Sequence, residues 1–255
     1  MAQADGLRKS LARSVFPSLL LMATEDGMTD ERLEKARHRL MREIEYDARD
    51  TASWTGRRAF SERVMAAMAS VPRHEFVRPE DRVAAYVNRP QRIGHGQTIS
   101  QPYIVALMTD LLDLEGEETI LEIGTGCGYQ AAVLSAAAAG GHVYSIETVE
   151  ALAEGARKRL DRLGYSNIDV RTGDGYAGWP EEAPFDAVIV TAAPEQIPET
   201  LVEQLKPGGR LVIPIGRAHS RQMLILLRKD KGGRVTSDKV LPVAFVPLVP
   251  REPPN

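Results

Sequence analysis

The sequence predicts an α/β fold whose mostly parallel sheet carries helices on both faces. Three observations support this prediction. From Thr119 onward, short apolar segments typical of strands alternate with segments of helical periodicity. A glycine-rich turn joins the first of these strands to the next helix, as in nucleotide-binding α/β folds. An amphipathic helical pattern precedes the alternating part, so we also expect an α-helical N-terminal extension.

The first part of the chain is expected to be mostly helical. Apolar residues from Leu33 to Ala48 recur at spacings of three and four, and Thr29 ahead of them is a favourable N-cap residue. Pro72 disfavours helix in the residue before it and therefore ends the second helix. Prolines and glycines mark residues 79–100 as irregular. Helices are thus expected over residues 29–50, 61–71 and 102–112.

The second part of the chain is expected to supply the sheet. Each expected strand is a short apolar segment bounded by glycine, proline or polar residues. Strands are expected over residues 119–123, 142–147, 168–172, 185–191, 210–214, 223–228 and 243–248. Helices are expected over residues 129–139, 148–163 and 198–205. Strands that alternate with helices form a mostly parallel sheet, and the last two strands are expected to pair with each other.

The composition is that of an ordinary globular protein and excludes several classes. Of 255 residues, 43% are hydrophobic and 26% charged, which argues against a disordered or fibrous chain. No apolar segment approaches the ~20 residues of a membrane span, so no membrane contact is expected. The net charge of -3 lacks the basic excess of a general nucleic-acid binder. Cys127 is the sole cysteine, and no cysteine or histidine spacing matches a metal site.

The extreme N-terminus loosely resembles a secretory signal. Basic residues at positions 8, 9 and 13 precede a short apolar stretch from Val15 to Ala23. Pro17 interrupts that stretch, and the small-residue cleavage pattern is missing. We therefore expect a cytoplasmic protein.

A glycine loop follows the first expected strand. Gly124, Gly126 and Gly128 have the spacing G-x-G-x-G, at the turn where a doubly wound sheet binds its nucleotide. A dinucleotide fingerprint would have its third glycine where this chain has Tyr129, and the Gly-Lys-Ser/Thr ending of a P-loop is missing. The loop therefore indicates a nucleoside site of another kind, with a purely structural turn as the alternative.

Three acidic residues lie close to the ends of consecutive expected strands. Glu147, 23 residues after Gly124, can accept hydrogen bonds from both hydroxyls of a ribose. Asp174 can accept from an adenine amino group, and Glu122 favours a ligand with an ammonium group over one with phosphate. Each acid alone is more often a solvated loop residue. Together they describe S-adenosylmethionine, which has a ribose, an adenine and an amino acid but no phosphate.

The most specific motif is the run Gln97-Thr98-Ile99-Ser100 within Ile93–Ile104. This segment closely resembles the signature of the protein-L-isoaspartate O-methyltransferase family. Further segments that resemble the family are 71–73, 76–77, 121–130, 143–147, 173–180, 185–193, 208–216 and 245–248. The resemblance implies a methyltransferase domain over residues 55–249, after a partly helical extension (1–54) and before a disordered tail (250–255). It also implies the Rossmann-like class I fold of S-adenosylmethionine-dependent methyltransferases, with a seven-stranded sheet.

The activity implied by the resemblance is protein repair. The enzymes of this family move a methyl group from S-adenosylmethionine to the free carboxylate of L-isoaspartyl residues in damaged proteins, with D-aspartyl residues as a further candidate substrate. The methyl ester then returns to aspartate through a succinimide. Ser100 is the implied catalytic residue. The implied cofactor-binding residues are Gln97, Thr98, Ile99, Ser100, Glu122, Gly124, Thr125, Gly126, Gly128, Glu147, Asp174 and Gly175. We expect a monomer, although the sequence leaves a dimer open.

The implied chemistry needs no general base. A free α-carboxylate has a pKa near ~3.5, so it is already an anionic nucleophile at neutral pH. Ser100 can hold it through its hydroxyl at the start of a helix, and a plain N-cap is the alternative role. Cys127 stands where the family usually has serine, and no histidine near it in sequence would activate a thiol. Val249 stands where many members have threonine.

Two other functions remain open at this point. One is methyl transfer to a small molecule or to RNA. An RNA enzyme usually has a basic surface or an Asn/Asp-Pro-Pro-aromatic motif, whereas this chain has Thr191-Ala192-Ala193-Pro194 at the corresponding strand end. The other is a catalytically inactive module that binds S-adenosylmethionine. Methyl transfer to an isoaspartyl peptide, compared with its aspartyl twin, distinguishes these functions from repair.

Overall fold

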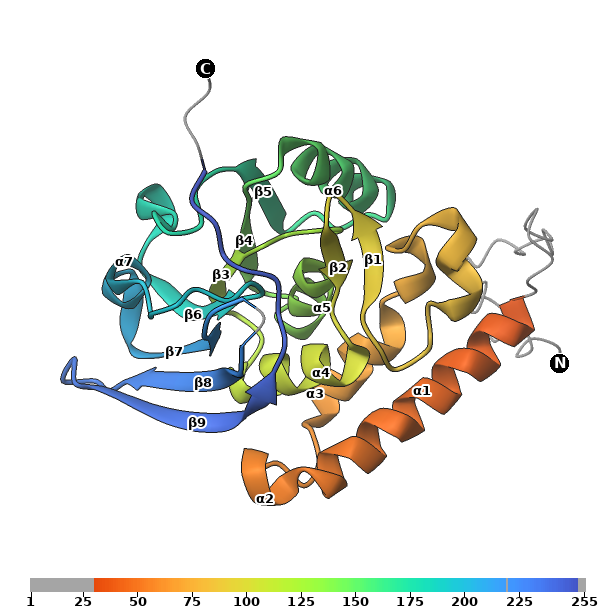
Figure 1. Cartoon of the computed structure of the whole chain (residues 1–255), viewed down its shortest axis with the longest axis horizontal. Coiled ribbons are helices and arrows are strands. Elements are labelled where there is room, and N and C mark those ends of the chain that lie inside the picture. The colour runs from red at the N-terminus through yellow and green to blue at the C-terminus, as the bar shows by residue number, and fades with distance from the viewer. Residues whose placement is uncertain (1–29, 219, 252–255) are drawn as a thin grey trace, which may run out of the picture.

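A seven-stranded sheet forms the centre of the computed structural model, which describes residues 30–218 and 220–251 (Figure 1). Its strand order is β5-β4-β3-β6-β7-β8-β9. The strands are β3 Thr119–Ile123, β4 His142–Glu147, β5 Ile168–Thr172, β6 Phe185–Val190, β7 Leu205–Ile215, β8 Gln222–Lys229 and β9 Val235–Val243. All neighbours from β5 to β7 are parallel, and β8 and β9 are added antiparallel. The predicted mostly parallel sheet is confirmed.

The helices begin and end close to the positions that the sequence predicts. Ser61 caps α3, because its side chain accepts a hydrogen bond from the Val64 backbone N–H at 3.3 Å. The helices are α1 Asp30–Asp50, α2 Ala52–Thr55, α3 Glu62–Ser70, α4 Pro102–Leu111, α5 Tyr129–Ala137, α6 Glu150–Arg162 and α7 Glu199–Glu203. Three short 3₁₀ helices cover Arg73–Glu75, Pro79–Ala84 and Pro180–Glu182. None of the helices in the described residues is both long and apolar enough to cross a membrane.

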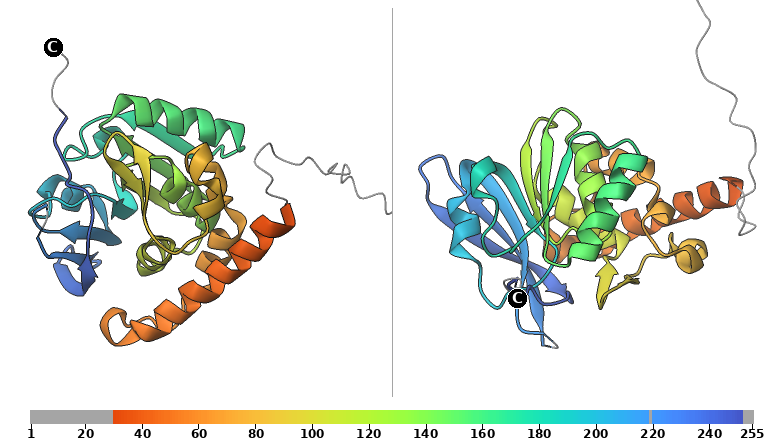
Figure 2. Two further views of the ribbon diagram at one scale, coloured as in Figure 1. Left: turned by 45° about the vertical axis from the view of Figure 1, so that its right-hand side comes forward. Right: turned by 90° about the horizontal axis from the view of Figure 1, so that it is seen from above.

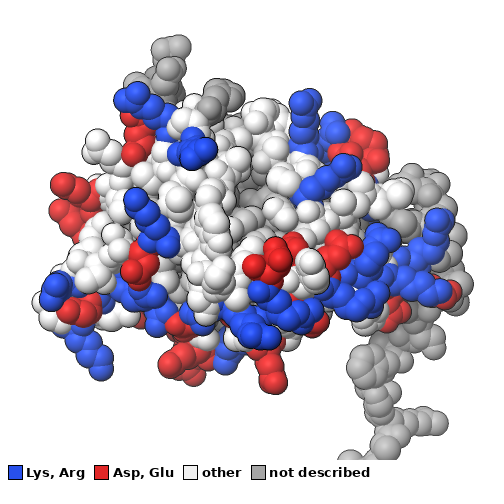
Figure 3. All heavy atoms as spheres, turned by 60° about the horizontal axis from the view of Figure 1, so that its bottom comes forward, with Lys and Arg blue, Asp and Glu red and all other residues white. Residues whose placement is uncertain are grey.

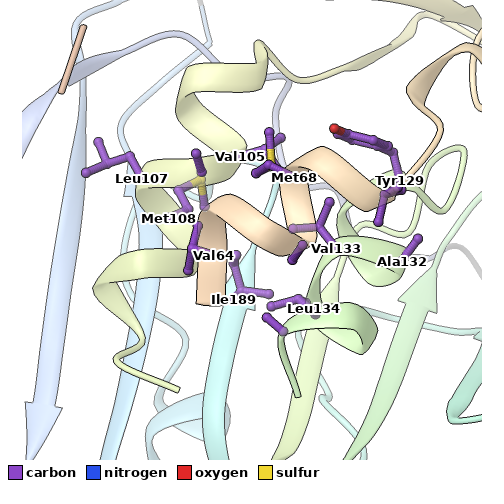
Figure 4. Packing of buried hydrophobic residues seen from close by; sticks show 14 of the residues in the cluster. Val64, Met68, Val105, Leu107, Met108, Tyr129, Ala132, Val133, Leu134 and Ile189 are labelled. Carbon is purple, nitrogen blue, oxygen red and sulfur yellow. The ribbon is translucent and has the colours of Figure 1, made fainter. Parts of the chain in front are cut away.

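Each face of the sheet has its own apolar core, because successive side chains of a strand point to opposite faces. Ile120 and Ile189 pack on one face with α3, α4 and α5, as Figure 4 shows for Ile189 and its neighbours. Leu121 and Val188 pack on the other face with Leu201 of α7. This arrangement confirms the predicted helices on both faces. It also explains why the central strands β3 and β6 are buried along nearly their whole length.

Helix α1 is part of the larger core although it precedes the sheet by some 70 residues of chain. Its buried residues Leu40, Ile44 and Ala48 belong to the same cluster as α3, α4 and α5. Figure 2 shows the helix lying along one side of the molecule. Residues 1–29, which include most of the expected extension and its signal-like stretch, lie outside the described residues, as do residues 252–255 of the tail.

Two expectations about secondary structure were wrong, and one further strand, β7, begins at Leu205 instead of at the predicted residue 210. Residues 79–100 are not wholly irregular, because they contain an antiparallel hairpin of β1 Gln91–Gly94 and β2 Gln97–Ile99. Its two-residue turn has positive φ at both His95 (51°) and Gly96 (73°), the backbone that matches the twist of a hairpin. Since glycine and proline mark loops and hairpin turns alike, these short strands gave little signal of their own.

The last strand was predicted too late in the chain. It is β9, Val235–Val243, and not residues 243–248. The first five residues of β9 are exposed, and polar side chains occupy most of them, so the apolar pattern missed this edge strand. Residues 244–248 instead cross the end of the sheet, where Ala193 N–H donates to the Val246 carbonyl (2.8 Å) and Leu248 N–H to the Ala193 carbonyl (2.9 Å).

The burial of α1 predicts a large effect of one substitution. Ile44→Ala removes a fully buried side chain and should lower the free energy of unfolding by about 2–5 kcal/mol. Tyr46→Ala, on the same helix but with 63% of the side chain exposed, should change it by less than about 0.5 kcal/mol. Urea unfolding of both variants measures the difference, and equal effects would contradict the packing of α1 in the core.

Candidate active site

A cavity lies at the carboxyl ends of the parallel strands, next to the point where the chain order reverses between β3 and β6. This is where open α/β sheets bind their ligands. Its walls are Gln97 and Thr98 of the hairpin, residues 123, 124 and 126, 146–148, Gly175, 191–192 and 246–249. Consecutive crossovers thus bring together residues that are more than 150 positions apart in the chain.

The three glycines of the loop have different tasks. All have positive φ, a conformation that only glycine adopts without strain. A Cβ on Gly124 would lie 2.4 Å from Thr191 Oγ1, and Gly124 lines the cavity. Gly126 also lines the cavity, whereas Gly128 is the N-cap residue of α5 and packs against Leu160. The loop therefore combines close packing between strands with an open backbone at the cavity.

Glu147 lies at the cavity wall, at the end of β4, with 6% of its surface exposed. Its Oε2 accepts a hydrogen bond from Gly126 N–H at 2.7 Å, and its Oε1 accepts from Val149 N–H at 3.0 Å. These two bonds fix the carboxylate between the glycine loop and the start of α6. The residue thus presents acceptor oxygens to the cavity from a rigid position.

Glu122 lies beneath the cavity and does not line it. The side chain is fully buried, accepts a hydrogen bond from Ser145 Oγ, and has no partner for Oε1 in the described residues. Ser145 is in turn 2.6 Å from Thr125 Oγ1. Burial raises the pKa of Glu122 to about 8 against the opposing effect of the Ser145 hydrogen bond, and the charge of Glu147 raises it further. Its predicted contact with an ammonium group stays a prediction.

The sequence predicts two cofactor-binding residues after β5, Asp174 and Gly175, and one of them lines the cavity. Gly175 lines the cavity, and a Cβ there would lie 2.4 Å from Ile123 Cγ2. Asp174 is half-buried beside it, and its Oδ1 accepts a hydrogen bond from Tyr176 N–H at 2.9 Å. The second oxygen of Asp174 has no partner within the described part of the chain. Its contact with an adenine amino group also stays a prediction.

Ser100 follows the hairpin and lines two cavities. It lines a small cavity with Thr125 and Cys127 and a large one on the side away from the glycine loop. The helix α4 has Gln101 as its N-cap residue, so the alternative role of Ser100 as an N-cap is wrong. Arg73 Nη2 donates to the Ser100 carbonyl at 2.7 Å and fixes its backbone. Ile99, next to it, is buried.

Sequence reasoning missed two parts of the site. Thr191 lines all three cavities, and its Oγ1 donates to the Gly124 carbonyl at 2.7 Å. It is the first residue after β6, a position that could have indicated it. Residues 246–249 also line the first cavity, but only the long return of the chain brings them there.

Cys127 has the features of a structural thiol. It is buried, and burial raises the pKa of its thiol. Because the thiolate is the reactive form of cysteine, this environment disfavours a nucleophile. In the described residues, no group of three histidine, cysteine, aspartate or glutamate side chains is arranged to hold a metal ion.

The fold and the glycine-loop cavity define a Rossmann-like, S-adenosylmethionine-dependent methyltransferase of class I. The chain belongs to the protein-L-isoaspartate(D-aspartate) O-methyltransferase family, because a sequence model of that family matches residues 54–253.

Relatives of known name cover nearly the whole chain. Protein-L-isoaspartate O-methyltransferase 2 of Syntrophobacter fumaroxidans is 55% identical over 94% of this chain and 98% of its own length. Protein-L-isoaspartate O-methyltransferase 1 of Cupriavidus necator is 53% identical, with 95% of each chain covered. The two alignments span 243 and 248 residues, which is more than the part of the chain after residue 54. Both therefore include part of the helical N-terminal region.

Solved structures support the fold. A protein-L-isoaspartate O-methyltransferase is 30% identical, with a TM-score of 0.70 over 83% of this chain and 65% of that chain. A second structure, a putative enzyme of the same name from Plasmodium falciparum in complex with S-adenosyl-L-homocysteine, is 24% identical. Its TM-score is 0.68, over 85% of this chain and 97% of that chain, and at this identity it supports the fold alone.

The buried acid Glu122 predicts a pH dependence of stability. Its folded pKa, about 8, lies above the ordinary value of 4.5, so the folded protein keeps a proton that the unfolded chain releases. The contribution of Glu122 to the free energy of unfolding is therefore fully present below the ordinary pKa. It is lost as the pH rises towards 8, at about 1 kcal/mol per pH unit.

Glu122→Gln should remove this slope, since an amide does not titrate. Urea unfolding of the wild type and the variant at several pH values between these limits measures it. Glu117→Gln, which alters an exposed acid on the approach to the same strand, should keep the wild-type slope. Parallel profiles for the wild type and Glu122→Gln would contradict the raised pKa.

Proposed function

We propose that the protein transfers a methyl group from S-adenosylmethionine to the free carboxylate of L-isoaspartyl residues in damaged proteins. The ester then closes to a succinimide, whose hydrolysis returns some normal aspartate. Family membership supports the reaction class. The observation that carries the proposal is the position of Ser100, which lines both a small cavity beside Thr125 and Cys127 of the glycine loop and a larger cavity of about 610 Å³. That volume can receive a segment of a peptide beside the cofactor.

The residues at the glycine-loop cavity fit the cofactor chemically. Glu147 offers carboxylate oxygens to ribose hydroxyls, and the described residues of the wall include no lysine or arginine of the kind that selects a phosphate. Gly124 and Gly126 leave the backbone accessible to a ligand. Among the cofactor-binding residues predicted from the sequence, Gln97, Thr98 and Gly175 also line this cavity. S-adenosylmethionine supplies a methyl group on a sulfonium, which is activated for displacement.

The protein's own part in the reaction is alignment and exclusion of water. An isoaspartyl carboxylate is ionised at neutral pH, so no residue has to remove a proton. Ser100 would hold this carboxylate with its hydroxyl, and Arg73 keeps the Ser100 backbone in place. Apolar residues such as Ile104 and Phe245 line the adjoining cavity and limit water. Alignment of two reactants can supply roughly 7–11 kcal/mol of the barrier.

We also propose that the protein acts as a monomer in the cytoplasm, on damaged proteins and not on nucleic acids. The large exposed apolar residues of the described chain include Trp54 of α2, Val83 of a 3₁₀ helix and Val235 of β9. Figure 3 shows charges of both signs interspersed on one face, which gives no support for a polyanion partner. A single, buried cysteine suits a reducing compartment. D-Aspartyl residues are a second candidate substrate.

The first test compares an isoaspartyl peptide with its aspartyl twin. Transfer of labelled methyl groups from S-adenosylmethionine should be confined to the isoaspartyl peptide, and methanol should appear as the ester collapses. Equal methylation of both peptides would exclude repair and favour another methyltransferase. Cofactor binding without transfer to either peptide would indicate an inactive binding module.

Ser100→Ala should lower kcat/KM for the isoaspartyl peptide by about 10–100-fold, the effect of losing one hydrogen bond to a charged group. Affinity for S-adenosylmethionine should change much less, because Glu147 remains. Ser237→Ala, an exposed position on β9, serves as the matched control. An unchanged kcat/KM in folded Ser100→Ala would remove this residue from substrate positioning.

Glu147→Gln tests the ribose contact. A hydrogen bond to a charged group contributes about 1.5–3 kcal/mol, so the affinity for S-adenosylmethionine should fall by at least about tenfold. Calorimetric titration measures it. Glu150→Gln, an exposed acid in the first turn of α6, should bind like the wild type. If both variants bind equally well, Glu147 does not hold the ribose.

A further inference from the structure

The large cavity beside Ser100 is mostly apolar but holds one acid. Tyr103, Ile104, Leu241, Val243 and Phe245 form much of its wall, and its volume is about 610 Å³. Thr98, Thr191 and Val246 line it as well as the glycine-loop cavity, so the two cavities adjoin. Asp47 of α1 also lines it. Among the described lining residues, Asp47 is the one carboxylate, and none is lysine or arginine.

Asp47 is held in position by polar contacts between α1 and the start of α4. Asn88 Nδ2 donates to Asp47 Oδ2 at 2.8 Å, while Asn88 Oδ1 accepts from the Tyr103 backbone N–H at 3.0 Å. The Tyr103 hydroxyl is 2.5 Å from Thr51 Oγ1, which donates to the Asp47 carbonyl at 2.8 Å. The carboxylate therefore belongs to a fixed cavity wall and not to a freely rotating surface side chain.

The charge of Asp47 has no cationic partner in the described part of the chain. Burial raises its pKa and nearby Asp50 raises it further, while the Asn88 hydrogen bond lowers it. A half-buried carboxylate in this setting gains from an incoming cation. An acidic side chain of the substrate placed next to Asp47 would be repelled by its charge.

We infer that Asp47 is a specificity-determining residue that binds a lysine or arginine of the substrate close to the isoaspartyl position. The apolar wall accommodates the methylene stem of such a side chain, and Asp47 meets its charged end. The occupant is thus a basic segment of the damaged protein. This inference rests on the proposed repair function, but it concerns the choice among isoaspartyl substrates.

The experiment uses the full chain and isoaspartyl peptides that differ at one position. Lysine, norleucine or glutamate is placed at each position next to and near the isoaspartate in turn. At the position that reaches the cavity, kcat/KM of the wild type should be about tenfold higher for lysine than for glutamate, with norleucine between them. Asp47→Asn should reduce this lysine-to-glutamate ratio to about one to two, because the amide has no charge.

Asp50→Asn is the matched control, since it makes the same change on the same helix at an exposed residue that does not line the cavity. It should keep the wild-type ratio. Thermal unfolding checks that both variants are folded. If Asp47→Asn methylates the peptides too slowly for kinetics, the lysine-to-glutamate ratio is taken from peptide affinities measured in the presence of S-adenosylhomocysteine.

Each outcome has a distinct meaning. The inference is overturned if the lysine-to-glutamate ratio of the wild type is near one at every position, or if Asp47→Asn leaves that ratio unchanged. Methylation of the norleucine peptide would still support the proposed repair function in either case. Failure to methylate any isoaspartyl peptide, the norleucine peptide included, overturns the proposed function instead. In that case, a lysine-to-glutamate affinity ratio of one overturns the role of Asp47 as well.

Discussion

A buried guanidinium links the backbone of Ser100 to the start of helix α5, which follows the glycine loop. Arg73 is fully buried, donates from Nε to the Ala85 carbonyl (2.9 Å) and from Nη2 to the Ser100 carbonyl (2.7 Å). Its guanidinium carbon lies 4.7 Å from the ring centre of Tyr129, the first residue of α5 after the glycine loop. Burial lowers the pKa of Arg73, although the guanidinium of arginine keeps its proton in proteins.

Arg73 therefore constrains the backbone of Ser100 and the start of α5 at once. Arg73 has no carboxylate partner among the described residues, so the two carbonyls and the ring face are what offset its loss of hydration. If Ser100 or the start of α5 moved away, a buried charge would lose a partner, which costs several kcal/mol. The spacing between Ser100 and the glycine loop is therefore fixed by the energetic demand of a buried cation.

The sequence predicted the central strands of the sheet well because burial on both faces leaves a clear apolar signal in β3 and β6. The strands β3, β4 and β5 have the predicted bounds, and cavity residues such as Glu147 follow from their place at a strand end. The exposed edge strand β9 and the short hairpin before Ser100 gave no such signal. Thr191 and the segment that crosses Ala193 were missed because their roles depend on contacts between distant parts of the chain. No local pattern encodes those contacts.

Helix α1 illustrates how one element can serve stability and selectivity through different residues. Its inward face, with Ile44 and Ala48, fills the core against α3 and α4, and this packing fixes the helix relative to the sheet. Asp47, which lies between Ile44 and Ala48 on the same helix, lines the large cavity and accepts a hydrogen bond from Asn88. The family match begins only at residue 54, so Asp47 lies outside the matched residues while most of the other residues that line its cavity lie within them. A change in the helix can therefore alter which substrates are preferred without a change in the residues that perform methyl transfer.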